Sequence, residues 1–418
     1  MRSYRSLTTA LSPGMRLLLR LRARRGREDG QRLAERRGHA SRSRPAGRLL
    51  WAHAVSVGEA ASALPLLARL QDAHGIKLLF TTTTVSAAGF VEQRLPAGGV
   101  HQFLPLDHQP WVSRFLDHWR PNWVLWVESD FWPGHMAELR RRGIPAALVN
   151  ARISRRSMAR WQRFPALMRQ TLSVFSPCLA ASEQQVARLA HLGANAPRYV
   201  GNLKAAPLPA TWSESNRTAI SRAIGSRPCW LAASTHAGEE QAAMDTHQAL
   251  VAKHSDLLTL VAPRHVSRAE TIVAEARARG LRVARRSHDD LPGPEHDLYL
   301  VDTLGELGLF FSAAPVCFIG GSLADHAGHN PFEAIHMNAA IIHGPHVQNF
   351  QEAYDRLGSL DAALCIRDSH GLTAAVHALL QSPQQTAGMA HRAHRLPELQ
   401  ANVVDTIHRE LEPLFARG

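Results

Sequence analysis

Residues 315–333 read PVCFIGGSLADHAGHNPFE, and this stretch is the most informative part of the sequence for the fold. A short apolar run, 316–319, ends in Gly320-Gly321 and is followed by a polar loop that reaches Pro331 just before a second apolar segment. This pattern is typical of a strand, a glycine turn and the start of a helix. Backbone N–H groups at such a helix start can face an anion, and the Glu333 carboxylate could accept hydrogen bonds from ribose hydroxyls. Taken alone, the stretch fits an ordinary βα turn as well as a ligand-binding loop.

The alternation of strand and helix patterns extends through most of the chain. It predicts two α/β domains, each with a parallel sheet covered by helices on both faces. In the first half of the chain the predicted strands span 49–55, 77–81, 101–104, 123–127 and 146–150. After a weakly periodic segment rich in Pro, Ser and Asn, a second run has predicted strands at 229–233, 257–262, 282–284, 298–301 and 316–319. Ligands of such sheets bind beyond the carboxyl ends of the strands, so the loops at these ends are the places to search.

The positive charge of the chain is concentrated at its N-terminus. Of the net charge of +13, residues 1–50 carry +11, from 14 arginines and three acidic residues, so the remainder is nearly neutral. A basic arm favours polyanions, either nucleic acid or an anionic membrane surface. Because the neutral body has no basic stripe interleaved with aromatic residues, nucleic-acid binding is the weaker alternative. The arm is compatible with a membrane-surface helix and with a solvated tail.

The N-terminal segment lacks the apolar length of a membrane-spanning helix. Its best apolar stretch, 15–21, is interrupted by Arg16 and Arg20, whereas a span needs roughly 18–20 apolar residues. A cleavable signal peptide fits poorly, because arginines follow the short apolar centre directly. The four cysteines are scattered without a CxxC pair. We therefore expect neither a disulfide framework nor a zinc–cysteine site. The same cysteine usage suits a reducing compartment.

Charged side chains follow two predicted strands of the first domain and close its last segment. Glu59 lies in the first turn of a predicted helix, where a carboxylate can cap the helix or act as a general base. Glu128-Ser129-Asp130 lacks further ligands nearby, so holding an arginine or a substrate hydroxyl is favoured over a metal site. Lys204, in the segment GNLK, could reach a phosphate or be a solvated surface charge.

The predicted strand ends of the second domain carry a different set of side chains. The loop 234–240, STHAGEE, is typical of a helix N-terminus with acids in its first turn, and its N–H groups could also bind phosphate. Arg264, after Pro263, could form a two-pronged contact with a phosphate or a base carbonyl. The segment 302–306, DTLGE, ends another strand with a predicted tight turn. Together these loops suit a nucleotide, whereas the carboxylates of the first domain suit proton transfer.

Several segments occur together in the order seen in one glycosyltransferase family. The sequence resembles the 3-deoxy-D-manno-octulosonic acid (Kdo) transferases of lipopolysaccharide assembly over about residues 30–415. The segments that carry the resemblance are WAHAVSVGEA (51–60), VESDFWPG (127–134), NARISRRS (150–157), GNLK (201–204), STHAGEE (234–240), APRH (262–265), DTLGEL (302–307) and GGS…GHNPFEA (320–334).

This resemblance implies an α/β protein of GT-B architecture, with two Rossmann-like domains whose parallel sheets face an interdomain cleft. The implied parts are a basic N-terminal membrane-associating arm (1–48), an acceptor domain (49–205), a linker (206–228), a CMP-sugar-binding domain (229–395) and a C-terminal helix that returns to the first domain (396–418). The implied reaction transfers Kdo from CMP-Kdo to a lipid A precursor, inverting and without metal or cofactor. The implied location is the cytoplasmic side of the inner membrane, where the protein would be peripheral or monotopic on an anionic surface.

The resemblance also implies roles for individual residues. Glu59 matches the general base that takes the proton of the attacking sugar hydroxyl. Glu128 and Lys204 match positions that stabilise the charge of the transition state. The residues that match the CMP-binding segments are Pro263, Arg264, Leu304, Gly305, Glu306, Asn330, Pro331, Phe332 and Glu333.

The chain departs from the family pattern near the predicted acceptor site and at the N-terminus. ESDFWPG stands where the family usually reads ETELWPN, so Asp130 replaces a longer acid and Gly134 replaces an Asn. A PYD segment becomes PLD at 105–107. The arginine-rich arm predicts attachment to the membrane by charge. A second interpretation is a GT-B glycosyltransferase or epimerase that uses another sugar nucleotide, and donor preference distinguishes the two.

Overall fold

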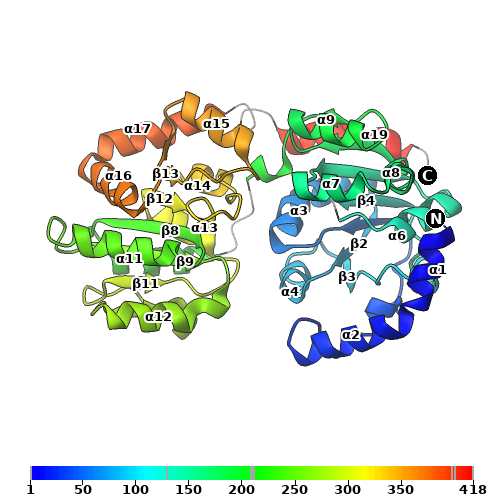
Figure 1. The fold of residues 1–418 in the computed structure, drawn as a ribbon, viewed down its shortest axis with the longest axis horizontal. Helices are drawn as coiled ribbons and strands as arrows, with labels where there is room; N and C mark the ends of the chain where they lie inside the picture. Colours follow the sequence, from blue (N-terminus) through cyan, green and yellow to red (C-terminus); the bar gives the residue numbers. More distant parts are fainter. Residues whose placement is uncertain (1, 129, 208–211, 397–398, 400–401, 417–418) are drawn as a thin grey trace. The chain divides into compact units, whose positions relative to one another are not determined.

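The structure is a computed structural model that describes residues 2–128, 130–207, 212–396, 399 and 402–416. The chain forms two compact units (Figure 1). The first unit comprises residues 1–206 together with 401–418, and the second comprises residues 207–400. Each unit is built around a sheet of seven parallel strands, as the α/β pattern of the sequence predicts.

The sheet of the first unit has the strand order β3-β2-β1-β4-β5-β6-β7. Its strands are β1 (Leu49–His53), β2 (Lys77–Thr82), β3 (Val100–Phe103), β4 (Trp123–Val127), β5 (Ala146–Ala151), β6 (Phe175–Ala180) and β7 (Arg198–Tyr199). The order reverses beside β1, because the chain adds β2 and β3 on one side and then returns to place β4 on the other. The carboxyl ends of β1 and β4 therefore flank the topological switch point, where ligands of such sheets bind.

Helices cover both faces of the first sheet. Those of the first unit are α1 (Arg2–Ala10), α2 (Ser12–Arg24), η1 (Glu35–Arg37), α3 (Val57–His74), α4 (Val85–Glu92), α5 (Gln109–Trp119), α6 (Pro133–Arg142), α7 (Arg155–Trp161), α8 (Pro165–Leu172), α9 (Glu183–His191), η2 (Leu203–Ala205) and α19 (Val403–Phe415). Successive strand residues point to opposite faces. Leu50 and Ala52 accordingly pack with α3, α4 and α19, whereas Leu49 and Trp51 pack with α5, α6 and α8.

Strands β6, β7, β13 (Ala340–His343) and β14 (Ala363–Cys365) are absent from the sequence-based prediction, and the clearest physical reason for the omission is found in β6. Its run FSPCLA contains Pro177, which cannot donate a hydrogen bond to a neighbouring strand and argues against a central strand. In the structure β6 pairs with β5 in an irregular register, and its second residue, Ser176, is exposed. Tertiary pairing with β5 and β7 thus places a segment whose local pattern does not specify a strand.

The N-terminal segment is more closely integrated into the fold than the predicted separate arm of residues 1–48. Buried Arg36 pairs with Glu28 at 3.2 Å and donates a hydrogen bond to the Leu104 carbonyl. The Phe103 amide donates to Glu35 at 2.8 Å. Among the described residues, no helix has both the length and the apolar character needed to cross a bilayer. Residues around 28–44 therefore belong to the first unit, and the segment before them forms α1 and α2.

The sheet of the second unit has the order β10-β11-β9-β8-β12-β13-β14, again with parallel pairing throughout. Its strands are β8 (Cys229–Thr235), β9 (Leu258–Pro263), β10 (Val283–Arg285), β11 (Leu298–Leu300), β12 (Val316–Ile319), β13 (Ala340–His343) and β14 (Ala363–Cys365). Here β8 and β12 flank the switch point. The stretch from Pro315 to Glu333 thus contributes the strand and loop on one side of it.

The helices of the second unit alternate with these strands. They are α10 (Glu214–Ile224), α11 (Glu239–Leu250), η3 (Val266–Arg268), α12 (Ala269–Ala278), η4 (Arg286–His288), α13 (Leu307–Ala313), α14 (Phe332–His336), α15 (Gln351–Ser359), α16 (Ser369–Gln381) and α17 (Pro383–Ala393). One core cluster joins the strands to α11, α12, α16 and α17. Helix α10 occupies much of the predicted linker 206–228, and residues 208–211 of that linker lie outside the described part of the chain.

Candidate functional site

Three predicted catalytic residues of the first unit gather at the switch point of its sheet. Glu59 lies in the first turn of α3, directly after β1, and Glu128 is the residue after β4. Lys204, in η2, forms an ion pair with Glu128. The sequence predicts strand-end positions for the two acids, and the parallel sheet brings these ends together. The pairing with Lys204 comes from the tertiary fold.

Local hydrogen bonds orient the Glu59 side chain. Its Oε2 accepts from the Val55 amide at 2.8 Å, and its Oε1 accepts from the Ser56 hydroxyl at 3.0 Å. The Ser56 hydroxyl in turn accepts from the Glu59 amide at 3.3 Å. The two side chains thus cap the helix start together, but the backbone amide that binds Glu59 is that of Val55, one residue before the N-cap Ser56, so the arrangement differs from a capping box in this contact. The capping alternative for Glu59 is therefore present in the structure, and it also holds the carboxylate in one position.

The environment of Glu59 changes its acidity. Burial, followed by the negative charge of Glu128, raises the pKa of Glu59 to about 7, whereas the Val55 amide and the charge of Lys204 lower it. The Glu59 side chain is half-buried, so it is still accessible. A carboxylate whose pKa lies near neutrality is suited to accept a proton from a hydroxyl.

Glu128 is held by its backbone and by two cations. Its φ of 60° is in the left-handed region, which is uncommon for a residue other than glycine, and its amide donates to the Val149 carbonyl at 3.0 Å. In addition to Lys204, the Arg152 Nε atom lies 3.9 Å from Glu128 Oε2. Arg152 follows β5, and sequence reasoning did not select it although it lies within the segment NARISRRS. Its position two residues beyond a strand-end Asn was the available signal.

Asp130, two residues after Glu128, is held by contacts of its own. Its Oδ2 accepts from the Trp132 indole at 2.6 Å and lies 3.4 Å from the His53 Nε2 atom. His53 is fully buried on β1, and burial lowers the pKa of its imidazole. Asp130 therefore contacts an indole and a buried histidine, which its sequence context does not reveal. Ser129, between the two acids, lies outside the described residues.

The second unit assembles a cluster of histidines around its strand ends. His236 follows β8, His265 follows β9, and His326 and His329 lie in the loop after β12. The Nε2 atoms of His236 and His329 are 3.0 Å apart, and the rings of His236 and His326 stack with centroids separated by 3.9 Å. Burial, together with neighbouring positive charges that include Arg264, lowers the pKa of His236 to about 4 and that of His329 to about 3. These imidazoles are therefore neutral at pH 7.

Arg264 and Glu333 are close enough to influence one another. Burial raises the pKa of Glu333, whereas the positive charge of Arg264 lowers it. Arg264 itself is exposed, and its amide donates to the Thr235 carbonyl at 2.9 Å, which ties the ends of β8 and β9 together. The structure thus brings together an exposed guanidinium, a half-buried carboxylate and neutral imidazoles at the strand ends of this sheet.

The Glu239 carboxylate accepts hydrogen bonds from the backbone amides of Gly321 and the three residues after it. It accepts from the amides of Gly321 at 2.7 Å and His236 at 2.9 Å, and also from those of residues 322–324 at 3.0–3.2 Å. Of the two alternatives for the 234–240 loop, helix capping and phosphate binding by its N–H groups, the second does not apply to His236, because its amide already donates to Glu239. A close approach of two loops explains the glycine at position 320. A Cβ at position 320 would lie 2.6 Å from the Ser234 carbonyl oxygen, so Gly320 lets two loops of the protein approach each other.

The remaining predicted CMP-binding residues lie on two neighbouring loops. Glu306 accepts two hydrogen bonds from the Arg286 guanidinium, at 2.7 and 3.1 Å, so its carboxylate is engaged within the protein. Gly305 has a φ of 86°, and Leu304 is 61% exposed. Pro263 ends β9 and is buried.

The segment Asn330 to Phe332 forms the entry to helix α14. The Asn330 side chain accepts from the Phe332 amide at 3.0 Å, and Pro331 precedes the first residue of the helix. Pro331 and Phe332 are buried, whereas Glu333 is half-buried. Of this segment, Glu333 and Asn330 are the polar side chains positioned by the helix start.

Comparison with known proteins identifies the family. The family described as 3-deoxy-D-manno-octulosonic-acid transferase (kdotransferase) matches residues 31–206. A probable mitochondrial 3-deoxy-D-manno-octulosonic acid transferase of Arabidopsis thaliana is 38% identical, over 84% of this chain and 80% of its own length. The chain belongs to the Kdo transferase family. The 3-deoxy-D-manno-octulosonic acid transferase of Haemophilus influenzae is 31% identical, over 93% of this chain and 92% of its own length. The relatives of this chain are therefore glycosyltransferases, as the sequence segments indicate.

Solved structures confirm the fold class of this Kdo transferase-family chain. A putative UDP-N-acetylglucosamine 2-epimerase from Listeria monocytogenes superposes with a TM-score of 0.63 at 14% identity, over 89% of this chain and 98% of that one. A UDP-GlcNAc 2-epimerase from Neisseria meningitidis gives 0.59 at 12% identity, over 87% and 100%. At these identities the likeness concerns the fold, which is that of two Rossmann-like domains of the GT-B class.

Two segments in which this Kdo transferase-family chain departs from the family pattern, 105–107 and 127–134, contact each other. The Asp107 carboxylate accepts from the amides of Gly134 at 2.8 Å and His135 at 2.9 Å, and from the Tyr4 hydroxyl at 2.6 Å. A Cβ at position 134 would lie 2.4 Å from Asp107 Oδ1. Gly134, where the family usually has Asn, therefore allows Asp107 to approach the start of α6.

Proposed function

We propose that this chain transfers Kdo from CMP-Kdo to a lipid A precursor, with inversion at the anomeric carbon and without a bound metal or cofactor. The observation that carries the proposal is the half-buried Glu59 at the first switch point, with a pKa raised to about 7 beside Glu128 and Lys204. Membership of the Kdo transferase family supplies the class of sugar.

In the proposed reaction Glu59 is the general base. It would accept the proton of an acceptor hydroxyl while that oxygen attacks the anomeric carbon of Kdo. The bond from this carbon to the phosphate oxygen would break on the opposite face, CMP would leave with the bonding electron pair, and the configuration would invert. Lys204 would offset negative charge near the reacting groups, and Glu128 would hold Lys204 in place.

The strand-end loops of the second unit are proposed to bind CMP. Exposed Arg264 is suited to a two-pronged contact with the phosphate. His236 and His329 are neutral and can act as hydrogen-bond donors or acceptors. The Glu333 carboxylate is proposed to accept hydrogen bonds from ribose hydroxyls. Because Glu239 already fills the amides of residues 321–324, these amides hold the loop and leave phosphate binding to the side chains.

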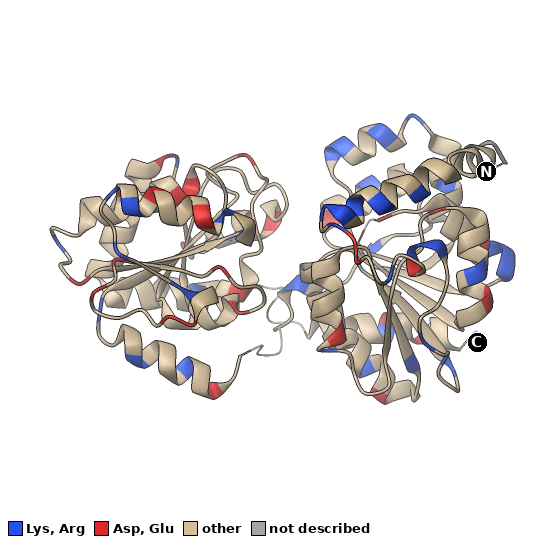
Figure 2. Ribbon diagram, turned by 90° about the horizontal axis from the view of Figure 1, so that it is seen from below, with Lys and Arg blue, Asp and Glu red and all other residues tan. Residues whose placement is uncertain are grey.

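The N-terminal helices are proposed to hold the protein on the cytoplasmic side of the inner membrane. Leu17 and Leu18, in α2, are 58% and 53% exposed, and Leu11 and Leu21 are exposed nearby. Arginines recur along the same helices (Figure 2). Exposed leucines together with arginines are typical of a helix that lies on an anionic membrane surface.

The decisive experiment is a transfer assay with purified protein, CMP-Kdo and a tetraacylated lipid A precursor, with products identified by mass spectrometry. Glu59→Gln should lower kcat by about 10²–10⁴-fold, the usual contribution of a general base. Calorimetric binding of CMP should stay within about threefold of the wild type, because Glu59 and the proposed CMP loops lie in different units. Glu183→Gln, which changes an exposed first-turn acid of α9, is the matched control and should keep full activity.

The same assay separates the proposed activity from its alternative. UDP-sugars replace CMP-Kdo in a parallel series, and activity with a UDP donor in place of CMP-Kdo would contradict the donor assignment. A wild-type rate in Glu59→Gln would contradict the assignment of the base without affecting that of the donor.

A further inference from the structure

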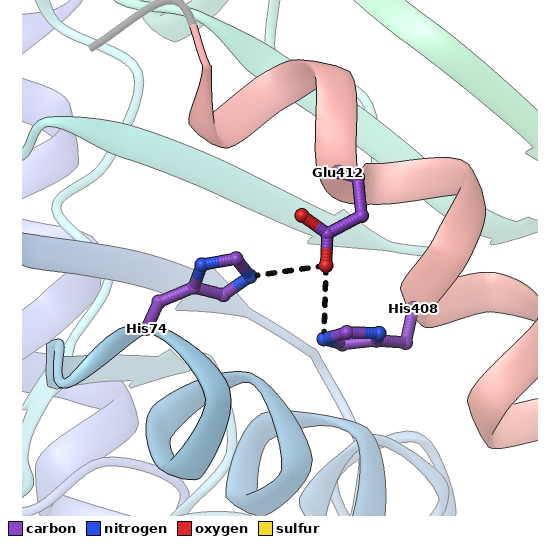
Figure 3. A group of neighbouring side chains, drawn as sticks. All are labelled: His74, His408 and Glu412. Atoms are coloured by element: carbon purple, nitrogen blue, oxygen red, sulfur yellow. Dashed lines mark ion pairs between the residues drawn. The ribbon is translucent and has the colours of Figure 1, made fainter.

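Two histidines and a carboxylate converge where the C-terminal helix packs on the first unit. His74 is the last residue of α3, and His408 and Glu412 lie one turn apart on α19. Figure 3 shows both imidazole rings directed toward the same Glu412 oxygen. The His74 and His408 Nε2 atoms lie 3.6 and 3.4 Å from Glu412 Oε1. All three atoms are within 4.8 Å of one another.

Two of these separations, each from a histidine Nε2 atom to the carboxylate oxygen, are close to the spacing of metal ligands. Neither distance is that of a good hydrogen bond, and both Nε2 atoms are buried without a hydrogen-bond partner among the described residues. Zinc binds imidazole nitrogen and carboxylate oxygen at about 2.0–2.2 Å, so two ligands at a tetrahedral angle lie about 3.3–3.5 Å apart. The observed spacing of each histidine from the carboxylate is close to this value.

The surroundings of the three side chains also suit a metal ion. His408 and Glu412 are four residues apart, which places both side chains on the same face of α19. The His74 ring stacks on Phe415, with centroids 4.2 Å apart, and Phe415 contacts Trp123. An apolar shell on one side restricts solvent and orients the imidazole. On the other side Glu412 is 49% exposed, so an ion can enter from solvent and keep a water as its fourth ligand.

We propose that His74, His408 and Glu412 form a Zn²⁺ site that fastens helix α19 to the end of helix α3. The role is structural, because Glu59 begins the same helix α3, and fifteen residues at 1.5 Å each separate it from His74 by roughly 22 Å. The proposal is independent of the proposed transfer reaction, in which no metal takes part. Helix α19 also contributes Ile407 and Leu411 to the core of the first unit, so the ion would reinforce an existing contact.

The test uses the full chain, stripped of metal with a chelator and titrated with Zn²⁺ against a chromophoric competitor. We expect one high-affinity Zn²⁺ per chain, a rise in Tm when it binds, and the visible absorption of tetrahedral Co²⁺ when cobalt replaces it. Glu412→Gln should weaken this binding by more than about tenfold and abolish the cobalt bands. Because Glu412 is half-exposed, this variant should fold. His408→Ala should give the same result.

Two control variants make the outcome specific. Glu410 lies on the same helix as Glu412 but pairs with Arg198. Glu410→Gln therefore removes an equal charge from α19 and should leave zinc affinity unchanged. His326→Ala disrupts the histidine cluster of the second unit and should also retain the high-affinity zinc. Binding that persists in both Glu412→Gln and His408→Ala, or that disappears in His326→Ala instead, would overturn the proposal. The absence of stoichiometric Zn²⁺ binding in the wild type would do the same.

Discussion

At the residue scale, the proposed chemistry depends on the acidity of the Glu59 carboxylate. Only its ionised form can accept a proton, so kcat/KM for transfer should rise with pH and level off above about 7. Glu128→Gln removes the nearby negative charge, so it should lower the Glu59 pKa and move this limb to lower pH. Lys204→Met removes a positive charge and should move the limb to higher pH. A pH profile of kcat/KM for the three proteins checks both signs, and an unshifted limb in both variants would remove Glu59 from the role of base.

The same pKa also makes the stability of the protein depend on pH. The folded-state pKa of about 7 exceeds the ordinary value of 4.5, so the folded state binds the proton more tightly between these values. The contribution of Glu59 to stability should therefore fall as pH rises from about 4.5 to about 7. Relative to the wild type, Glu59→Gln should gain on the order of 1–3 kcal/mol in free energy of unfolding between pH 5 and pH 8. Urea denaturation at both values measures this gain, and a constant difference would count against it.

At the element scale, helix α11 and the loop after β12 are joined by one buried carboxylate. Glu239 accepts five backbone amides, so its replacement leaves several donors without a partner. Glu239→Gln should lower the free energy of unfolding of the second unit by roughly 2–4 kcal/mol. Amide hydrogen exchange in residues 320–331 should accelerate by at least about tenfold.

The matched comparison for Glu239 is Glu270→Gln. Glu270 is likewise a first-turn acid, in the neighbouring helix α12, but it is exposed and pairs with Arg285 at the surface. This change should stay within about 0.5 kcal/mol of the wild type. Equal effects of the two substitutions would show that the amide contacts of Glu239 contribute nothing specific to the loop.

At the scale of the whole molecule, we propose that the exposed leucines and the arginines of the N-terminal helices attach the protein to a membrane surface. The double substitution Leu17→Ser and Leu18→Ser should weaken binding to vesicles that contain phosphatidylglycerol by at least about tenfold, because each leucine side chain contributes about 1.5–3 kcal/mol when buried. Raised salt should weaken the binding of the wild type. Vesicle co-sedimentation measures both effects.

The membrane test needs a control that changes an equally exposed leucine elsewhere and leaves the fold of the first unit intact. Leu291→Ser changes an exposed leucine of the second unit and should leave vesicle binding unchanged. Deletion of residues 1–45 is a poorer test, because it removes Glu35 and Arg36, which contact β3 and the residue after it. Retention of the Leu17/Leu18 variant at wild-type levels would contradict the assigned surface.

The alternation of short strands and helices was sufficient to predict two parallel α/β domains. Strands β4 and β12 lie where the pattern places them, because a buried parallel strand requires a short continuous apolar run. The strand-end positions of Glu59, Glu128 and Arg264 were predictable for the same local reason. Strand β6 was not, because Pro177 and an exposed serine disguise a segment whose pairing depends on β5 and β7.

The sequence alone determined most of the elements and which reactive side chains stand at their carboxyl ends, because hydrophobic periodicity and turn residues act over a few neighbours. Only the tertiary structure decided which of these side chains have partners. It placed Lys204 and Arg152 on Glu128, filled the amides after Gly321 with Glu239, and brought His74 to Glu412. These contacts join segments far apart in the chain. They arise from the packing of whole elements, and no local sequence pattern records that packing.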